Sequence, residues 1–163
     1  IEVVAYDHPD ATRLLAGSRQ DTISRYGGED GTPVQPAEFS APAGRFLVAY
    51  LDGEPMACAG WRSRGSDAEL KRMFVEPAAR GRGLARALLT ATEQSAGTAG
   101  NIRVILETGT KQPEAAALYR SAGTTDIPKF GIYANEPGCI CLGKALTEPG
   151  SVPTLQPATA DNG

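Results

Sequence analysis

The stretch RGRGLARALL, at residues 80–89, is a loop of arginine and glycine that runs directly into a helical pattern. The first turn of a helix presents backbone N–H groups without internal acceptors, and the helix dipole adds partial positive charge there. Glycine lets a ligand approach that backbone closely. The stretch therefore predicts a binding site for an anion, above all for phosphate.

The charge around this loop is unlike that of the whole chain. The segment from Lys71 to Arg86 has five basic residues and one acidic residue, Glu76, so its net charge is +4, whereas the chain of 163 residues has a formal net charge of −3. Only 6% of the residues are aromatic. This distribution favours one local phosphate site and argues against a nucleic-acid partner.

The stretch RGRGLARALL matches neither of two common nucleotide-binding motifs. A P-loop needs Gly-Lys followed by Ser or Thr, which is missing here, and a GxGxxG fingerprint needs a third glycine where Arg86 stands. The strands predicted before the loop also form an antiparallel meander, unlike half of a dinucleotide-binding fold. A nucleotide-binding protein of another class is therefore disfavoured.

The sequence around the loop resembles motif A of the GNAT acyltransferase superfamily. In LKRMFVEPAARGRGLARALL, the residues Arg80, Gly83 and Ala85 fill the family pattern of Gln or Arg, two residues, Gly, one residue, and Gly or Ala. The later stretch VILETGTKQPEAAALYRSAG resembles the family's next strand and its tyrosine-bearing helix. The resemblance covers roughly residues 45–146.

The resemblance implies a GNAT-like fold of the α/β (α+β) class, with a mixed central sheet of about six to seven strands flanked by about four helices. It also implies an N-acetyltransferase that moves an acetyl group from acetyl-CoA to a primary amine by direct attack, with a small molecule favoured as the acceptor. A non-catalytic module that binds or senses acyl-CoA is the alternative.

The resemblance also implies which residues bind acetyl-CoA. The N–H groups of residues 81–86 would hold the pyrophosphate, and the strand end at 73–75 would pair with the pantetheine amides. Gln112 stands where the family often has Asn, so the amide is kept with one more methylene. The predicted cofactor-binding residues are Met73, Phe74, Val75, Arg80, Gly81, Arg82, Gly83, Leu84, Ala85, Arg86, Gln112 and Tyr119.

Three side chains are the catalytic candidates. The resemblance implies that Tyr119 lies near the acetyl-CoA sulfur and acts as the general acid, although a tyrosine that only packs on the sheet is the alternative. Two carboxylates compete as the general base. Glu107 ends the strand after motif A, at a position that serves as base in some relatives, and Glu69 is expected in phase with Lys71, Met73 and Val75. An ion pair of Glu69 with Arg62 is the structural alternative, and Glu107 is slightly preferred.

The acceptor amine is less well defined. The loop at 27–44, the region of Trp61 and Arg62, and the stretch at 130–137 are candidate walls of its site. A cationic acceptor would suit Asp30, Glu29 or Glu38, and an acidic one Arg62, Arg64 or Lys129. Small amines, amino acids, antibiotics and protein amino groups all remain open. Thr124 also stands where the family usually has an aromatic residue.

The remaining patterns predict the elements that would hold these residues. Expected strands cover 1–5, 46–51, 56–64, 68–75, 102–107, 127–133 and 139–146. Expected helices cover 9–26, 84–97 and 113–122, with a short turn at Pro36–Phe39 inside a long loop. One domain is expected at 1–146, followed by a disordered tail at 147–163 that is rich in Pro, Thr and Ala.

Composition also limits partners and location. An odd number of cysteines without paired spacing gives no disulfide framework, and with one histidine and no CxxC no metal is expected. Cys139 and Cys141 would share one face of a strand as apolar fillers. No apolar run reaches the ~20 residues of a membrane helix and no signal peptide is visible, so a cytoplasmic protein without a membrane partner is expected. A homodimer is left open.

Overall fold

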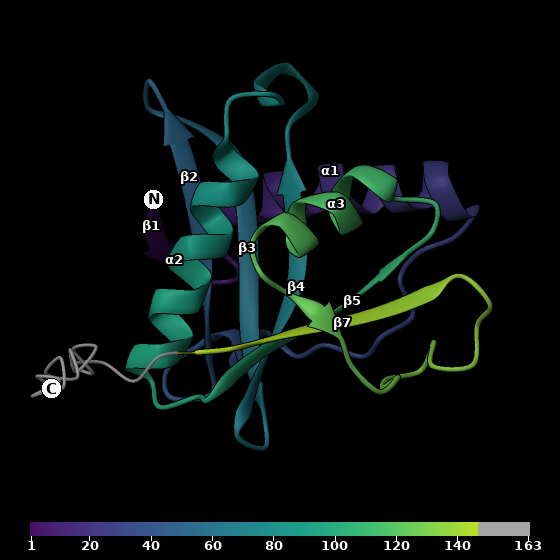
Figure 1. Cartoon of the computed structure of the whole chain (residues 1–163). Coiled ribbons are helices and arrows are strands. Elements are labelled where there is room, and N and C mark those ends of the chain that lie inside the picture. Colours follow the sequence, from purple (N-terminus) through teal and green to yellow (C-terminus); the bar gives the residue numbers. More distant parts are fainter. Residues whose placement is uncertain (147–163) are drawn as a thin grey trace, which may run out of the picture.

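The computed structural model describes residues 1–146, and the expected tail at 147–163 lies outside them. Its centre is a seven-stranded sheet in the order β1-β2-β3-β4-β5-β7-β6 (Figure 1). All neighbouring strands are antiparallel except β4 and β5, which are parallel. The strands are β1 (Glu2–Val4), β2 (Gly44–Leu51), β3 (Glu54–Arg64), β4 (Asp67–Val75), β5 (Arg103–Gly109), β6 (Thr125–Asp126) and β7 (Cys139–Ala145). The expected mixed sheet of six to seven strands is confirmed.

Three α-helices and two short 3₁₀ helices flank the sheet within residues 1–146, where about four helices were expected. Helix α1 begins where the His8 ring accepts a hydrogen bond from the Asp10 N–H (3.0 Å), and it ends at Gly27, whose φ of 75° is left-handed. No helix of these residues is long and apolar enough to cross a membrane. The helices are α1 (Pro9–Tyr26), η1 (Pro36–Phe39), η2 (Pro77–Ala79), α2 (Leu84–Thr98) and α3 (Pro113–Ser121).

Helices cover both faces of the sheet, so the core has two parts. On one face, α1 packs Leu14 against Phe46 and Phe74. On the other face, α2 and α3 pack against the sheet around Trp61, which is fully buried and donates from its indole N–H to Ser95 Oγ at 2.9 Å. Each large apolar side chain buried in this way contributes roughly 1.5–3 kcal/mol to stability.

A β-bulge interrupts β4 at Arg72, which has a φ of 60°. Cys58 of β3 is opposite Phe74, but Gly60, two residues on, is opposite Lys71, so β4 contains one extra residue there. The expectation that Glu69 is in phase with Met73 and Val75 is therefore wrong. Beyond the bulge, Met73 and Val75 pack on the α2/α3 face and Phe74 on the α1 face.

Strands β4 and β5 separate soon after they meet. Their parallel register covers three residue pairs and ends at Glu69 and Ile105. From there β5 continues along β7, with which it pairs over its whole length, and both run at a wide angle to β4 (Figure 1). The later half of β4, which includes the bulge, therefore has one edge without a partner strand.

The segment after α3 differs from the expected strand at 127–133. β6 is only Thr125–Asp126, paired with Leu142 and Gly143 of β7, and an irregular segment follows up to residue 138. Pro128 cannot donate to a strand ladder, and Gly131 has a left-handed φ of 80°. These two residues explain why the apolar pattern there does not form a strand.

Candidate active site

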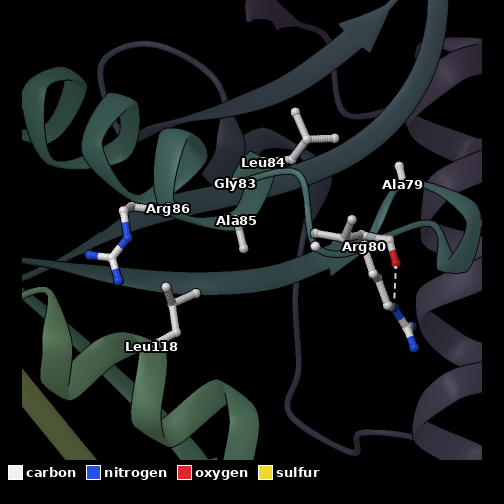
Figure 2. A pocket seen from close by; sticks show the side chains of 9 residues that line it. Ala79, Arg80, Gly83, Leu84, Ala85, Arg86 and Leu118 are labelled. Atoms are coloured by element: carbon white, nitrogen blue, oxygen red, sulfur yellow. Dashed lines mark hydrogen bonds between the residues drawn. The ribbon is translucent and has the colours of Figure 1, made fainter.

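A cavity of about 190 Å³ lies where the end of β4 meets the start of α2 (Figure 2). Two of its residues, Ala79 and Leu118, are not among the predicted cofactor-binding residues; all the others are. Leu118 reaches it from α3, so the cavity is bounded by two helices as well as by the strand. The lining residues are Val75, Ala79, Arg80, Gly81, Gly83, Leu84, Ala85, Arg86 and Leu118.

The loop beside this cavity has the geometry of an anion site. Gly81 and Gly83 have φ values of 80° and 78°, and the space where a Cβ atom would lie is open at both. The first helical hydrogen bond of α2 runs from the Ala87 N–H to the Gly83 oxygen at 3.0 Å. The N–H groups at the start of α2 therefore have no acceptor within the helix. These features fit a phosphate group, with no side chain in its way.

Two arginines of the loop also tie neighbouring elements together. Arg80 donates from Nε to the Val75 oxygen at 3.2 Å (Figure 2), and its guanidinium lies 3.7 Å from Asp21 of α1. Arg86 donates to Ser121 Oγ at 2.6 Å, which links α2 to α3. Both side chains are thus positioned by protein contacts beside the cavity.

Lys71 and Arg72, two further basic residues of the segment, form ion pairs with Asp30 instead of contributing charge to this loop. Lys71 Nζ lies 3.4 Å from Asp30 Oδ2, and Arg72 binds the same carboxylate oxygen at 2.5 Å. The sequence therefore overestimates the basic charge at the loop of residues 80–86, which comes from Arg80, Arg82 and Arg86.

Glu107 lies on the α1 side of the sheet, just beyond the point where β4 and β5 separate. Its side chain is 10% exposed, and Oε1 is 3.5 Å from Lys71 Nζ. Oε2 is buried and has no hydrogen-bond partner. Burial raises the pKa of Glu107, and the positive charge of Lys71 opposes this. The structure thus provides one carboxylate oxygen that no protein group occupies.

The other carboxylates near this site are engaged. Arg62 binds Glu69 Oε1 at 3.0 Å, and Glu69 is only 2% exposed, which confirms the ion pair considered as its structural role. Burial alone would raise the pKa of Asp30, but Lys71 and the Thr32 N–H outweigh it and hold that pKa well below its usual range. Asp30 is therefore a fixed negative charge at neutral pH.

Tyr119 is placed on the opposite, α2/α3 side of the sheet. Its side chain is 6% exposed, and burial raises its pKa to about 12. The hydroxyl therefore holds its proton at neutral pH. Gln112, at the start of α3, accepts a hydrogen bond from the Tyr26 hydroxyl at 3.1 Å, a contact with α1 that the sequence does not predict.

Two loops meet over Glu107. The Gly31 N–H donates to the Tyr133 hydroxyl at 2.6 Å, which joins the loop after α1 to the segment before β7. A Cβ atom added at Gly131 would lie 2.9 Å from Glu107 Oε2, so the backbone there packs directly on the carboxylate. The stretches proposed from the sequence as acceptor walls are brought together. The sequence does not reveal that the Tyr133 hydroxyl binds Gly31 or that Lys71 pairs with Asp30 and Glu107, because these contacts join distant segments.

The chain is similar to known acetyltransferases. The model described as "Acetyltransferase (GNAT) family" matches residues 12–124. A protein of Azospirillum brasilense named "IAA acetyltransferase" is 39% identical over 110 residues, which are 66% of this chain and 72% of the relative.

Solved structures show the same fold. An acetyltransferase of the GNAT family from Staphylococcus aureus has a TM-score of 0.72 at 15% identity, covering 90% of this chain and 99% of that one. A ribosomal-protein-alanine N-acetyltransferase from Brucella melitensis has a TM-score of 0.70 at 19% identity, covering 90% and 100%. Both are too distant in sequence to indicate more than the fold.

Proposed function

Since the chain belongs to the GNAT family of acetyltransferases, we propose that it transfers an acetyl group from acetyl-CoA to a primary amine of a small molecule. As a member of this family it is an acyltransferase, and acetyl-CoA is the cosubstrate of the family. One observation carries the proposal. The loop at residues 80–86, which has the geometry of an anion site, follows β4, and Glu107 lies on β5 just beyond the point where the two strands separate.

The residues present fit acetyl-CoA. The N–H groups from Gly81 to Arg86 would hold the pyrophosphate, and the unpaired edge of β4 would hydrogen-bond the pantetheine through its backbone. Phe74 could contribute only its backbone, because its side chain is buried on the α1 face. When bound, the cosubstrate supplies an acetyl group activated as a thioester. Leu118 would give the cavity an apolar wall on the α3 side.

Tyr119 is the proposed general acid. A tyrosine whose pKa is about 12 is a proton donor and not a base at neutral pH. Donation from its hydroxyl would neutralise the thiolate that leaves when the acetyl group is transferred. Tyr119 is on α3, the helix that also supplies the cavity residue Leu118, and its own side chain is buried against the sheet and does not line the cavity.

Glu107 is the proposed general base, acting on the attacking ammonium directly or through one water. Its Oε2 atom, buried beneath the Gly131 backbone, accepts no hydrogen bond from the described residues, whereas Glu69 is held by Arg62. Its raised pKa makes it a stronger base than an exposed glutamate. Asp30 is already paired with Lys71 and Arg72, so its charge does not select the acceptor, whereas the closed contact between Gly31 and Tyr133 favours a small one. A homodimer and a cytoplasmic location stay predictions.

Release of the CoA thiol in the presence of a panel of primary amines tests the proposed activity. We expect thiol release that depends on the amine, with an N-acetylated product that mass spectrometry detects in equal amount. Binding of acetyl-CoA without thiol release for any amine would contradict transfer and support the acyl-CoA-binding alternative.

Glu107→Gln tests the base. This substitution keeps the shape of the side chain and removes the proton acceptor, so we expect kcat/KM near neutral pH to fall by about 10²–10⁴-fold. Activity should recover in part at high pH, as more of the amine loses its proton without help. The measurement is a pH profile of kcat/KM with one amine of known pKa.

Glu69→Gln is the matched control for this profile. It should lower activity less and show no recovery at high pH, because Glu69 serves the ion pair with Arg62. Recovery in Glu69→Gln but not in Glu107→Gln would reverse the two roles. Full activity of both variants would show that the amine needs no dedicated base.

A further inference from the structure

Glu107 also belongs to a second group of side chains, which lies on the same face of the sheet. It is directly opposite Cys141 in the β5–β7 register, and Cys139 lies two residues from Cys141 on that face. The two sulfur atoms are 3.8 Å apart. One ligand atom from each of the three residues lies within 4.8 Å of the other two. Linear spacing of cysteines cannot reveal this group, because its third member comes from another strand.

The distance between the sulfur atoms is that of a metal site. Tetrahedral zinc with Zn–S bonds of about 2.3 Å places two sulfur ligands about 3.8 Å apart. A carboxylate oxygen at about 2.0–2.2 Å from the metal would lie about 3.5 Å from each sulfur. A movement of roughly 1 Å by the Glu107 carboxylate closes the remaining gap. The spacing of the two thiols thus matches that of two sulfur ligands on one metal ion.

Burial and charge around the three residues also suit a cation. Cys139 is 7% and Cys141 2% exposed, and Glu107 Oε2 is buried without a donor. Two thiolates and one carboxylate would leave one net negative charge around a divalent ion. The ammonium of Lys129, which donates to the Cys139 oxygen, and that of Lys71 lie close enough to compensate it.

We propose that Glu107, Cys139 and Cys141 form a binding site for a thiophilic divalent cation, Zn²⁺ or Cd²⁺, and that the bound metal stops acetyl transfer. Each thiol would release its proton to solvent as its sulfur binds the ion. The fourth position of the metal would be filled by water. Binding of the Glu107 carboxylate to the metal would leave the amine without its proton acceptor. The inhibition rests on the proposed role of Glu107, whereas metal binding does not.

Titration of the reduced protein with Cd²⁺ tests the binding, because thiolate–cadmium bonds give an ultraviolet charge-transfer band. We expect one Cd²⁺ per chain. We expect the band to disappear in Cys139→Ala and in Cys141→Ala, or to halve while Cd²⁺ affinity falls at least about 10-fold. This size is expected because even residues outside the ligand set change metal affinity about 10–100-fold. Glu107→Gln should keep the band and also weaken binding about 10-fold or more.

Cys58→Ala is the matched control. Cys58 is buried in the α1-side core, away from β7, so its loss should leave the Cd²⁺ titration unchanged. Circular dichroism confirms that each variant is folded, and Cys139→Ser replaces Cys139→Ala if the latter is not. Wild-type Cd²⁺ affinity in the Cys139→Ala/Cys141→Ala double variant, or equal weakening by Cys58→Ala, would overturn the site.

A second measurement separates inhibition from binding. Zn²⁺ should inhibit thiol release by the wild-type protein, a chelator should restore it, and the double cysteine variant should be at least 10-fold less sensitive to Zn²⁺. Wild-type sensitivity of the double variant would overturn the proposed inhibition. If no amine supports transfer, the Cd²⁺ band still decides whether the site exists, so the two proposals fail separately.

Discussion

Gly83→Glu should weaken acetyl-CoA binding by about 100-fold or more. Gly83 precedes α2, lines the cavity, and has open space where a side chain would begin. A glutamate there would place a carboxylate at the N–H groups that are proposed to hold the pyrophosphate. A 100-fold loss is about 3 kcal/mol, the scale of one lost hydrogen bond to a charged group. Calorimetric titration of both proteins with acetyl-CoA measures the effect.

Two control variants separate charge from backbone strain. Gly83→Ala has the same strain at a positive φ, about 1–2 kcal/mol, but adds no charge, so it should melt earlier and still bind. Gly65→Glu adds the same charge at another open glycine of positive φ, in the turn between β3 and β4, and should bind normally. A folded Gly83→Glu protein with wild-type affinity would contradict the proposed phosphate site.

Tyr119→Phe should lower turnover by about 10²–10⁴-fold while acetyl-CoA binding stays nearly unchanged. The substitution removes only the hydroxyl and keeps the ring that packs between α3 and the sheet. Because burial holds the pKa of Tyr119 at about 12, the wild-type hydroxyl is protonated throughout the neutral range, and its loss should be felt at every pH there. Single-turnover kinetics, in which chemistry sets the rate, provide the measurement.

Tyr50→Phe is the control for the loss of a hydroxyl. The Tyr50 hydroxyl donates to Asp10 at 2.7 Å, on the α1 side and away from the proposed chemistry. Its removal should change stability without changing the rate of transfer. If Tyr119→Phe turned over within a factor of about two of the wild type, Tyr119 would have only a packing role.

The features of the site that are local in sequence could be predicted. An anion site at a helix N-terminus needs a few consecutive residues, so the loop from Arg80 to Arg86 was recognisable in the sequence alone. The helix α1 and the meander of β2, β3 and β4 were also predictable, because each shows its own periodicity or turn residues. The structure adds Leu118, which reaches the cavity from α3, beyond the intervening helix α2 and strand β5.

The features that depend on pairing between distant segments could not be predicted. Lys71 and Asp30 are 41 residues apart, and no local pattern connects them. The bulge at Arg72 is invisible in a strand whose residues alternate normally on either side of it, yet it reverses the faces of all that follow. The sequence places Glu107 on a strand but ends that strand at Glu107, whereas β5 continues to Gly109, and the contact of Glu107 with Lys71 comes from the fold.

The short β4–β5 ladder has a consequence for cooperativity. Three registered pairs connect β1 to β4 with β5, β6 and β7, whereas β2 and β3 are paired along eight positions. The amide protons of β5 and β7 should therefore exchange with solvent through partial opening events that leave β1 to β4 folded. A ligand bonded to both halves would suppress these openings. Acetyl-CoA would then complete the folding unit as well as take part in the reaction.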